Sequence, residues 1–185
     1  SAAQAARRRV VFPSVITPIG GLSMPPRLFP TRHDLPADNR RDLIALLNTH
    51  VADLTDLRSQ TKYAHWNVKG PTFIALHELF DKFVGELDDL IDDTAERATA
   101  LGGVALGTIR HAAAASRLPE FPAETFAGLS VVEALAVRYA GVAKSTREAI
   151  DRADTLGDAD TADLFTAASR ELDKALWFLE AHLQG

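Results

Sequence analysis

The sequence predicts an all-α protein, a four-helix bundle with a long middle crossover. From residue 38 onward, apolar residues recur every three or four positions through four long segments, the spacing that places them on one face of a helix. No segment shows the alternation of apolar and polar residues that is typical of a strand. The first and third connections between the segments are short and the second is long, which is the connectivity of a bundle with one crossover.

The first two helices are predicted on either side of Gly70-Pro71. The first extends over about residues 38–68 and ends there, because this dipeptide cannot continue a helix. Thr72 is the expected cap of the second helix, which ends at Gly102-Gly103, as helices commonly do. Its apolar face consists of Phe73, Leu76, Phe80, Phe83, Leu87 and Leu90.

The second half of the chain begins with the crossover. Residues 103–129 form a long connection of small residues, with room for one short extra helix. Ser130-Val131-Val132-Glu133 is a capping box, in which the end residues bond to free backbone N–H groups, and it predicts a third helix to about residue 153. A fourth helix is expected over about residues 160–183, with Leu164, Ala168, Leu172, Leu176 and Leu179 on its apolar face.

The first 36 residues differ in amino-acid composition and charge from the rest. We expect residues 1–36 to be a flexible, basic, proline-rich N-terminal arm, followed by a bundle domain over residues 37–185. The arm holds six of the nine prolines, which exclude both helix and central strand. Residues 1–33 carry a charge of +5 and no acid, so the remainder carries −10. Met24 is the only methionine, so the sequence leaves open whether residues 1–23 belong to the native protein.

The sequence gives no sign of a membrane partner. No apolar run approaches the roughly 20 residues that span a bilayer. The stretch 7–22 has the basic start and apolar continuation of a secretory signal, but its prolines and glycines argue against export. We therefore expect a cytoplasmic protein.

Candidate metal ligands gather on one face of the second helix. Cysteine is absent, so any metal is expected to be held by His and carboxylates, a set suited to iron, manganese or zinc. The face is lined by His77, Asp81, Asp88, Asp92 and Glu96, and His65 lies twelve residues before the first of these. Taken singly, each acid is explained as solvated surface and each histidine as structural; His50, without a carboxylate at fixed spacing, is interpreted as structural.

The spacing of these residues limits how they bind a metal. His77 and Asp92 lie roughly 22 Å apart along a helix, so no single ion touches both. Either the two halves are unrelated, or a second copy of the chain brings them together by antiparallel two-fold pairing, which creates two equivalent sites. A di-iron site inside one bundle needs Glu-x-x-His motifs, and this chain has none.

The sequence resembles the Dps family (DNA-binding proteins from starved cells, the miniferritins of the ferritin-like superfamily) over roughly residues 34–183. The resemblance is strongest in four runs of the sequence: Lys62–Pro71, Phe73–Asp81, Asp92–Arg97 and Thr166–Phe178. It implies a ferritin-like four-helix bundle and a homo-oligomer, a hollow dodecamer built of two-fold dimers.

The resemblance also implies an activity. Family members are ferroxidases that oxidise Fe(II), usually with hydrogen peroxide, and store Fe(III) inside the shell, which protects DNA from oxidative damage. The resemblance assigns the iron ligands as His65, His77 and Asp81 from one chain with Asp92 and Glu96 from its partner. Trp66 matches a position thought to intercept radicals; the alternative is an aromatic that fills the interface.

Two further sites follow from the resemblance with alternatives left open. Asp158 and Asp163 match acids that line a three-fold pore in some relatives; the alternative is a pair of acids favoured at a helix N-terminus. Many relatives bind DNA through a lysine-rich tail, whereas this arm is arginine-based, with Arg7, Arg8 and Arg9 as candidate contacts. Either twelve arms bind DNA together, with nucleoid association, or the arm packs on a neighbouring subunit. The alternative function is a DNA-compacting architectural protein with little ferroxidase activity.

Overall fold

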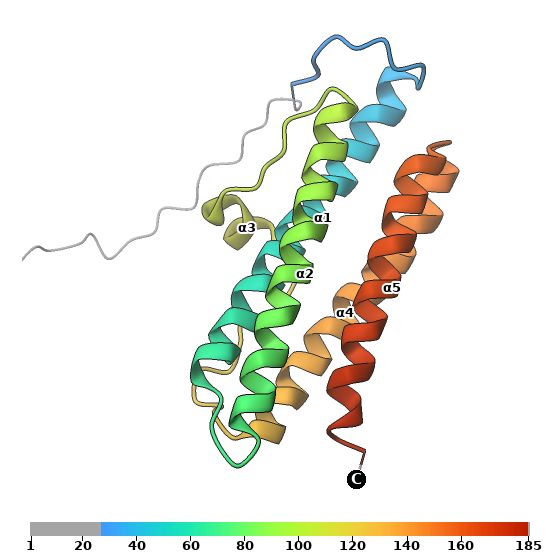
Figure 1. The fold of residues 1–185 in the computed structure, drawn as a ribbon. Helices are drawn as coiled ribbons and strands as arrows, with labels where there is room; N and C mark the ends of the chain where they lie inside the picture. The colour runs from blue at the N-terminus through green and yellow to red at the C-terminus, as the bar shows by residue number, and fades with distance from the viewer. Residues whose placement is uncertain (1–26, 185) are drawn as a thin grey trace, which may run out of the picture.

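A computed structural model describes residues 27–184, and its described part is all-helical apart from one isolated backbone bridge between Lys69 and Ala127. The helices are α1 (Ala37–Asn67), α2 (Phe73–Ala100), α3 (Ile109–Ala115), α4 (Gly128–Thr155) and α5 (Ala159–Ala181). α1 packs along α2 and α4 along α5, and the crossover with α3 lies on the outer side of α1 (Figure 1). The expected four-helix bundle, its long crossover and its short extra helix are confirmed.

One helix begins earlier than the sequence suggested. α4 starts at Gly128 with Ala127 as its N-cap, so Ser130 lies inside the first turn and the prediction of a capping box was wrong. The reason is a contact distant in sequence. Lys69 donates from its backbone N–H to Phe126 O at 2.8 Å and accepts from Gly128 N at 3.0 Å. These bonds fix the chain against the α1–α2 turn and set the start of α4 there.

The interior of the bundle has two parts. The part nearer the α1–α2 turn contains the fully buried aromatic side chains Phe80, Phe83 and Tyr139 among leucines and valines. Toward the other end, Leu43, Leu47 and other aliphatic residues pack around Phe165. Each such side chain contributes roughly 1.5–3 kcal/mol when fully buried. None of the helices within residues 27–184 is long and apolar enough to cross a membrane.

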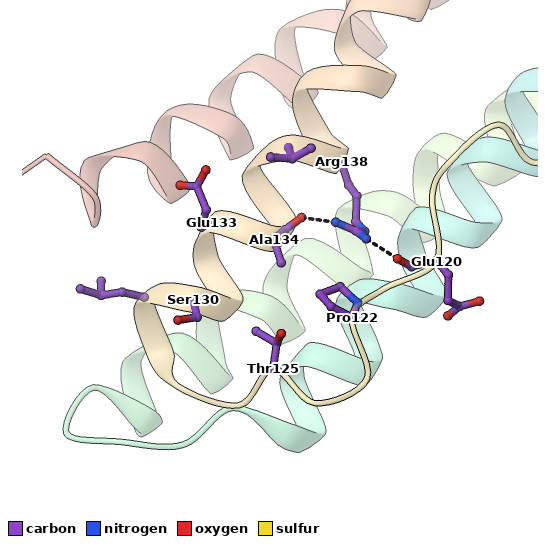
Figure 2. Close-up of a pocket in the computed structure, with 9 residues that line it drawn as sticks. Glu120, Pro122, Thr125, Ser130, Glu133, Ala134 and Arg138 are labelled. Atoms are coloured by element: carbon purple, nitrogen blue, oxygen red, sulfur yellow. Dashed lines mark hydrogen bonds between the residues drawn. The ribbon is translucent and has the colours of Figure 1, made fainter.

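Charged side chains attach the crossover to the bundle. Arg117 donates to the buried carboxylate of Asp53 on α1 through its backbone N–H and its guanidinium. The buried Arg138 donates to Ala134 O and to Glu120 O (Figure 2). It also donates to the side chain of Gln60 on α1. Burial lowers the pKa of Arg138. These bonds join α1, α4 and the second half of the crossover.

Residues 27–36, which the sequence assigns to the flexible arm, are irregular in structure and lie against the bundle. Phe29 donates from its backbone N–H to Gly102 O at 2.7 Å, and Arg40 donates to Leu101 O at 2.9 Å. Gly102 has a φ of +89°, and a Cβ there would lie 2.8 Å from Phe29 O, so only glycine fits. The rest of the predicted arm, including Arg7, Arg8 and Arg9, lies outside the described residues.

Candidate metal centre

His65 and His77 meet at the turn that joins α1 to α2. The turn spans residues 68–72 and reverses the chain, so that the end of one helix lies beside the start of the next. The two imidazole rings stack with centroids 3.7 Å apart and planes inclined by 20°. His65 is 8% exposed, and the centroid of the Phe73 ring lies 5.1 Å from that of His77.

Each ring is oriented by the backbone of the other residue. His65 Nδ1 lies 2.7 Å from His77 O, and His77 Nδ1 lies 2.9 Å from His65 O. A carbonyl oxygen only accepts, so both Nδ1 atoms donate and carry the proton in the neutral ring. The lone pair of each imidazole is therefore on Nε2, the form in which histidine binds metals.

Asp81 lies one turn after His77 and adds a carboxylate to the pair. Its Oδ1 is 3.9 Å from His65 Nε2. The same oxygen accepts a hydrogen bond from the ammonium of Lys62 on α1. This hydrogen bond, assisted by the charge of Lys62, holds the pKa of Asp81 below its usual value, so the carboxyl is ionised near neutral pH. Lys62 is not among the site residues predicted from the sequence, although it lies one turn before His65 and therefore on the same helix face.

The remaining predicted ligands lie further along α2. Asp92 and Glu96 are exposed and one turn apart, and the helix rise places Asp92 roughly 22 Å from His77. Within the described part of the chain, no three His, Asp or Glu side chains converge on one metal position. Asp88, on the same face, is bound to Arg58 at 2.9 Å. One chain thus presents a histidine half and an acidic half that do not meet.

Trp66 lies beside the histidine pair and points out of the fold. It is 65% exposed, and Phe73 and Ile74 across the turn are exposed as well. Both interpretations of Trp66 need an indole outside the core of its own subunit. The exposure is therefore compatible with interface filling and with radical interception alike.

Asp158 and Asp163 lie in different surroundings. Asp158 is 4% exposed and caps α5, accepting from the backbone N–H of Thr161 and from Arg97 at 2.7 and 2.9 Å. Burial alone would raise the pKa of Asp158, but hydrogen bonds from Arg97 and Thr161 outweigh it and hold the pKa below its usual value. Its carboxylate is engaged within the chain, which favours the helix-terminus alternative over a pore ligand. Asp163 is exposed on α5, and its pore role stays a prediction.

Two surface hollows lie away from the histidine pair. One, of about 550 Å³, is formed where the crossover meets α4 and is lined by Glu120, Leu129, Glu133 and Val137, among others (Figure 2). None of the predicted iron ligands lines it. Another, of about 580 Å³, includes Glu96 and Arg97. The histidine half of the candidate centre is therefore an arrangement on α1 and α2 that lies outside both hollows.

Comparisons with known proteins point in one direction. The sequence matches the family described as Ferritin-like domain over residues 44–185. It is 48% identical over 154 residues to the DNA protection during starvation protein of Agrobacterium fabrum, covering 83% of this chain and 95% of the relative. The structure is similar to DpsA14 from Streptomyces coelicolor, with a TM-score of 0.80, 37% identity and coverage of 85% and 95% of the two chains. It is also similar to a Dps protein from Vibrio cholerae O1, named as a member of a superfamily of ferritin-like diiron-carboxylate proteins, with a TM-score of 0.76, 26% identity and coverage of 81% and 94%.

Proposed function

This chain belongs to the Dps family of ferritin-like proteins, and on that premise we propose that it is a ferroxidase and iron-storage subunit. Fe(II) is its substrate, hydrogen peroxide is the oxidant, and Fe(III) is stored inside a shell of twelve copies. Removing Fe(II) and peroxide together protects DNA. The observation that supports this most directly is the His65–His77 pair, whose Nε2 atoms are free for metal beside the ionised Asp81.

The proposed site forms between two subunits. Antiparallel two-fold pairing places His65, His77 and Asp81 of one copy opposite Asp92 and Glu96 of the other, so each dimer has two equivalent sites. The separation of the two halves along α2 supports this, because neither half is a sufficient ligand set. Exposed apolar side chains beside the histidines, Phe73 and Ile74, suit burial in such an interface.

The reaction needs two iron ions for each peroxide. Two Fe(II) ions each lose one electron, the O–O bond of hydrogen peroxide breaks, and two protons complete two water molecules. A paired transfer avoids the one-electron step that releases hydroxyl radical. The neutral imidazoles and carboxylates bind Fe(II) while leaving positions for the oxidant. The charge of −10 on residues 34–185 raises the local concentration of cations.

DNA binding is the second candidate function, and the charge of the arm favours it. Residues 1–33 carry +5 against an acidic body, and twelve arms on one shell would bind DNA together. A binding isotherm at two salt concentrations, with and without residues 1–26, tests this. Binding that depends on the arm and weakens with salt supports a nucleoid-associated, cytoplasmic protein. Binding that ignores the arm would rule out Arg7, Arg8 and Arg9 as the contacts.

The ferroxidase proposal is tested by mixing Fe(II) and hydrogen peroxide with the purified protein and with a His65→Ala/His77→Ala variant. The mass of each assembly is measured alongside. We expect a wild type of twelve subunits that oxidises iron rapidly, and an assembled variant that does not. If both proteins oxidise Fe(II) equally slowly, His65 and His77 are not the iron ligands, and the DNA-compacting alternative is favoured.

A further inference from the structure

The histidine half of the centre contains a cation of its own. Lys62 precedes His65 by one turn of α1, and its ammonium bonds to Asp81 Oδ1. That oxygen is also the one that lies 3.9 Å from His65 Nε2. The Lys62 side chain is only 24% exposed, so water screens its charge less than that of a fully extended surface lysine. The carboxylate that would bind iron is thus already paired.

The acidic half of the face is different. Moving along α2, Asp81 is paired with Lys62 and Asp88 with Arg58, both basic residues of α1. Asp92 and Glu96 have no basic side chain within 4.0 Å in the part of the chain that the structure describes. Among the predicted iron ligands, the carboxylate that is paired with a cation is therefore the one beside the imidazoles.

We propose that Lys62 is a competing cation, which Fe(II) displaces from Asp81 when it binds and which pairs with Asp81 again when the oxidised iron leaves. This inference rests on the proposed function, because it concerns the same site. A metal that binds must replace an existing ion pair, so its affinity is lower than the ligand set alone would give. A metal that leaves exposes no unpaired carboxylate, because the ammonium returns.

The consequence is a centre suited to iron as a passing substrate. A storage protein has to move each Fe(III) ion from the centre into the shell, whereas an enzyme with a resident metal has to retain it. The opposite role for Lys62 is to hold Asp81 in the orientation that metal needs. Competition predicts tighter metal binding when the ammonium is removed, and positioning predicts weaker binding.

The test is a calorimetric titration of the assembled, full-length protein with Co(II), a divalent probe that avoids turnover. Lys62→Met keeps the length of the side chain and removes its charge, and we expect it to bind Co(II) about two- to fivefold more tightly. Lys62→Arg retains a cation and should bind like wild type. Lys144→Met is the control, because Lys144 is an exposed lysine that pairs with Glu148 at 4.0 Å on the surface of α4, and it should leave the affinity unchanged.

A second arm asks whether Lys62 acts through Asp81. In an Asp81→Asn background, Lys62→Met should no longer change the affinity for Co(II), because no carboxylate charge remains to compete for. If Lys62→Met binds Co(II) as wild type does, or more weakly, the inference is overturned. Lys62→Gln gives the same comparison if the methionine variant does not assemble.

The titrations distinguish an error in the role of Lys62 from an error in the proposed site. If wild type and His65→Ala/His77→Ala titrate identically with Co(II), neither the site nor the inference stands. If the histidine variant loses Co(II) binding and Lys62→Met gains none, only the role of Lys62 is overturned. A second readout is repeated iron dosing: Lys62→Met should oxidise a second dose of Fe(II) more slowly than its first, because it retains product at the centre.

Discussion

His65 and His77 orient each other through reciprocal hydrogen bonds, each Nδ1 donating to the backbone carbonyl of the other residue. Metal-binding histidines usually donate this proton to a carboxylate, a carbonyl or water. Here both acceptors belong to the histidine pair itself. The direction of both Nε2 lone pairs therefore depends on the register of α1 against α2, which the turn between them sets.

A substitution that strains the α1–α2 turn should weaken metal binding. Gly70, in this turn, has a φ of +119°, which costs an L residue about 1–2 kcal/mol. Gly70→Ala should lower the free energy of unfolding by about that amount and also reduce Co(II) affinity, because the histidine register shifts. Gly157→Ala, at a φ of +78° in the α4–α5 turn, is the matched control. It should cost similar stability without changing Co(II) affinity; equal losses of affinity in both variants would contradict the link between turn and site.

Mixed shells should recover activity that neither parent has. A His65→Ala chain has intact acids, and an Asp92→Asn/Glu96→Gln chain has intact histidines. Refolded together in equal amounts, half of the dimers are mixed, and each mixed dimer has one intact site of two. We expect about a quarter of wild-type Fe(II) oxidation from the mixture and almost none from either parent. A mixture no more active than its parents would exclude a site shared between subunits.

His50 should make the fold sensitive to mild acid. It is 2% exposed, its Nδ1 donates to Leu46 O at 3.0 Å, and its Nε2 is the one buried side-chain polar atom without a partner in the described residues. Burial lowers the pKa of His50 below 6.5; the charge of Arg117 adds to this and that of Asp53 opposes it. Because the unfolded chain binds the proton at a higher pH, stability is complete above about pH 6.5 and is lost as pH falls through the lowered pKa.

The measurement is the melting temperature of the assembled protein between pH 7.5 and 5.5. His50→Leu should melt with a smaller dependence on pH than wild type over this range. His182→Gln, which changes an exposed histidine, should keep the wild-type dependence. If His50→Leu retains the full dependence, His50 is not the group that titrates.

Asp158 should matter far more for stability than an exposed acid with the same kind of partner. Asp158→Ala removes the cap of α5 and leaves the mostly buried Arg97 with the more distant carboxylate of Asp160, at 3.9 Å, so we expect a loss of about 2–4 kcal/mol in the free energy of unfolding. Asp173 pairs with Arg147 at 2.7 Å where both side chains are about half exposed. Asp173→Ala should cost less than about 1 kcal/mol. Chemical denaturation of the two variants checks the difference, and equal losses would contradict it.

Much of the fold could be predicted from the sequence because helices depend on near neighbours. The apolar period of Phe73 to Leu90, the break at Gly70-Pro71 and the glycines at 102 and 103 place α2 to within a few residues. The ligand face of α2 follows from the same period, since residues four and seven apart share a side of the helix. The rise of the helix per residue also shows that His77 lies too far from Asp92 for both to bind one metal ion.

Other features depend on residues far apart in the chain, and only the tertiary structure decided them. α4 begins at Gly128 because Lys69, some sixty positions earlier, bonds to both sides of that point. Asp158 is a buried cap because the folding of α2 against α5 brings Arg97 to it.

In the candidate metal centre, too, some features follow from the sequence and others from the tertiary structure. The sequence determined that this chain has four long helices and a face of histidine and acids without cysteine. The tertiary structure decided which nitrogen of His65 and His77 is free and that Lys62 pairs with Asp81. The physical reason is that helical periodicity is a local property of the backbone, whereas hydrogen bonds and ion pairs between α1 and α2 depend on the register in which the two helices pack.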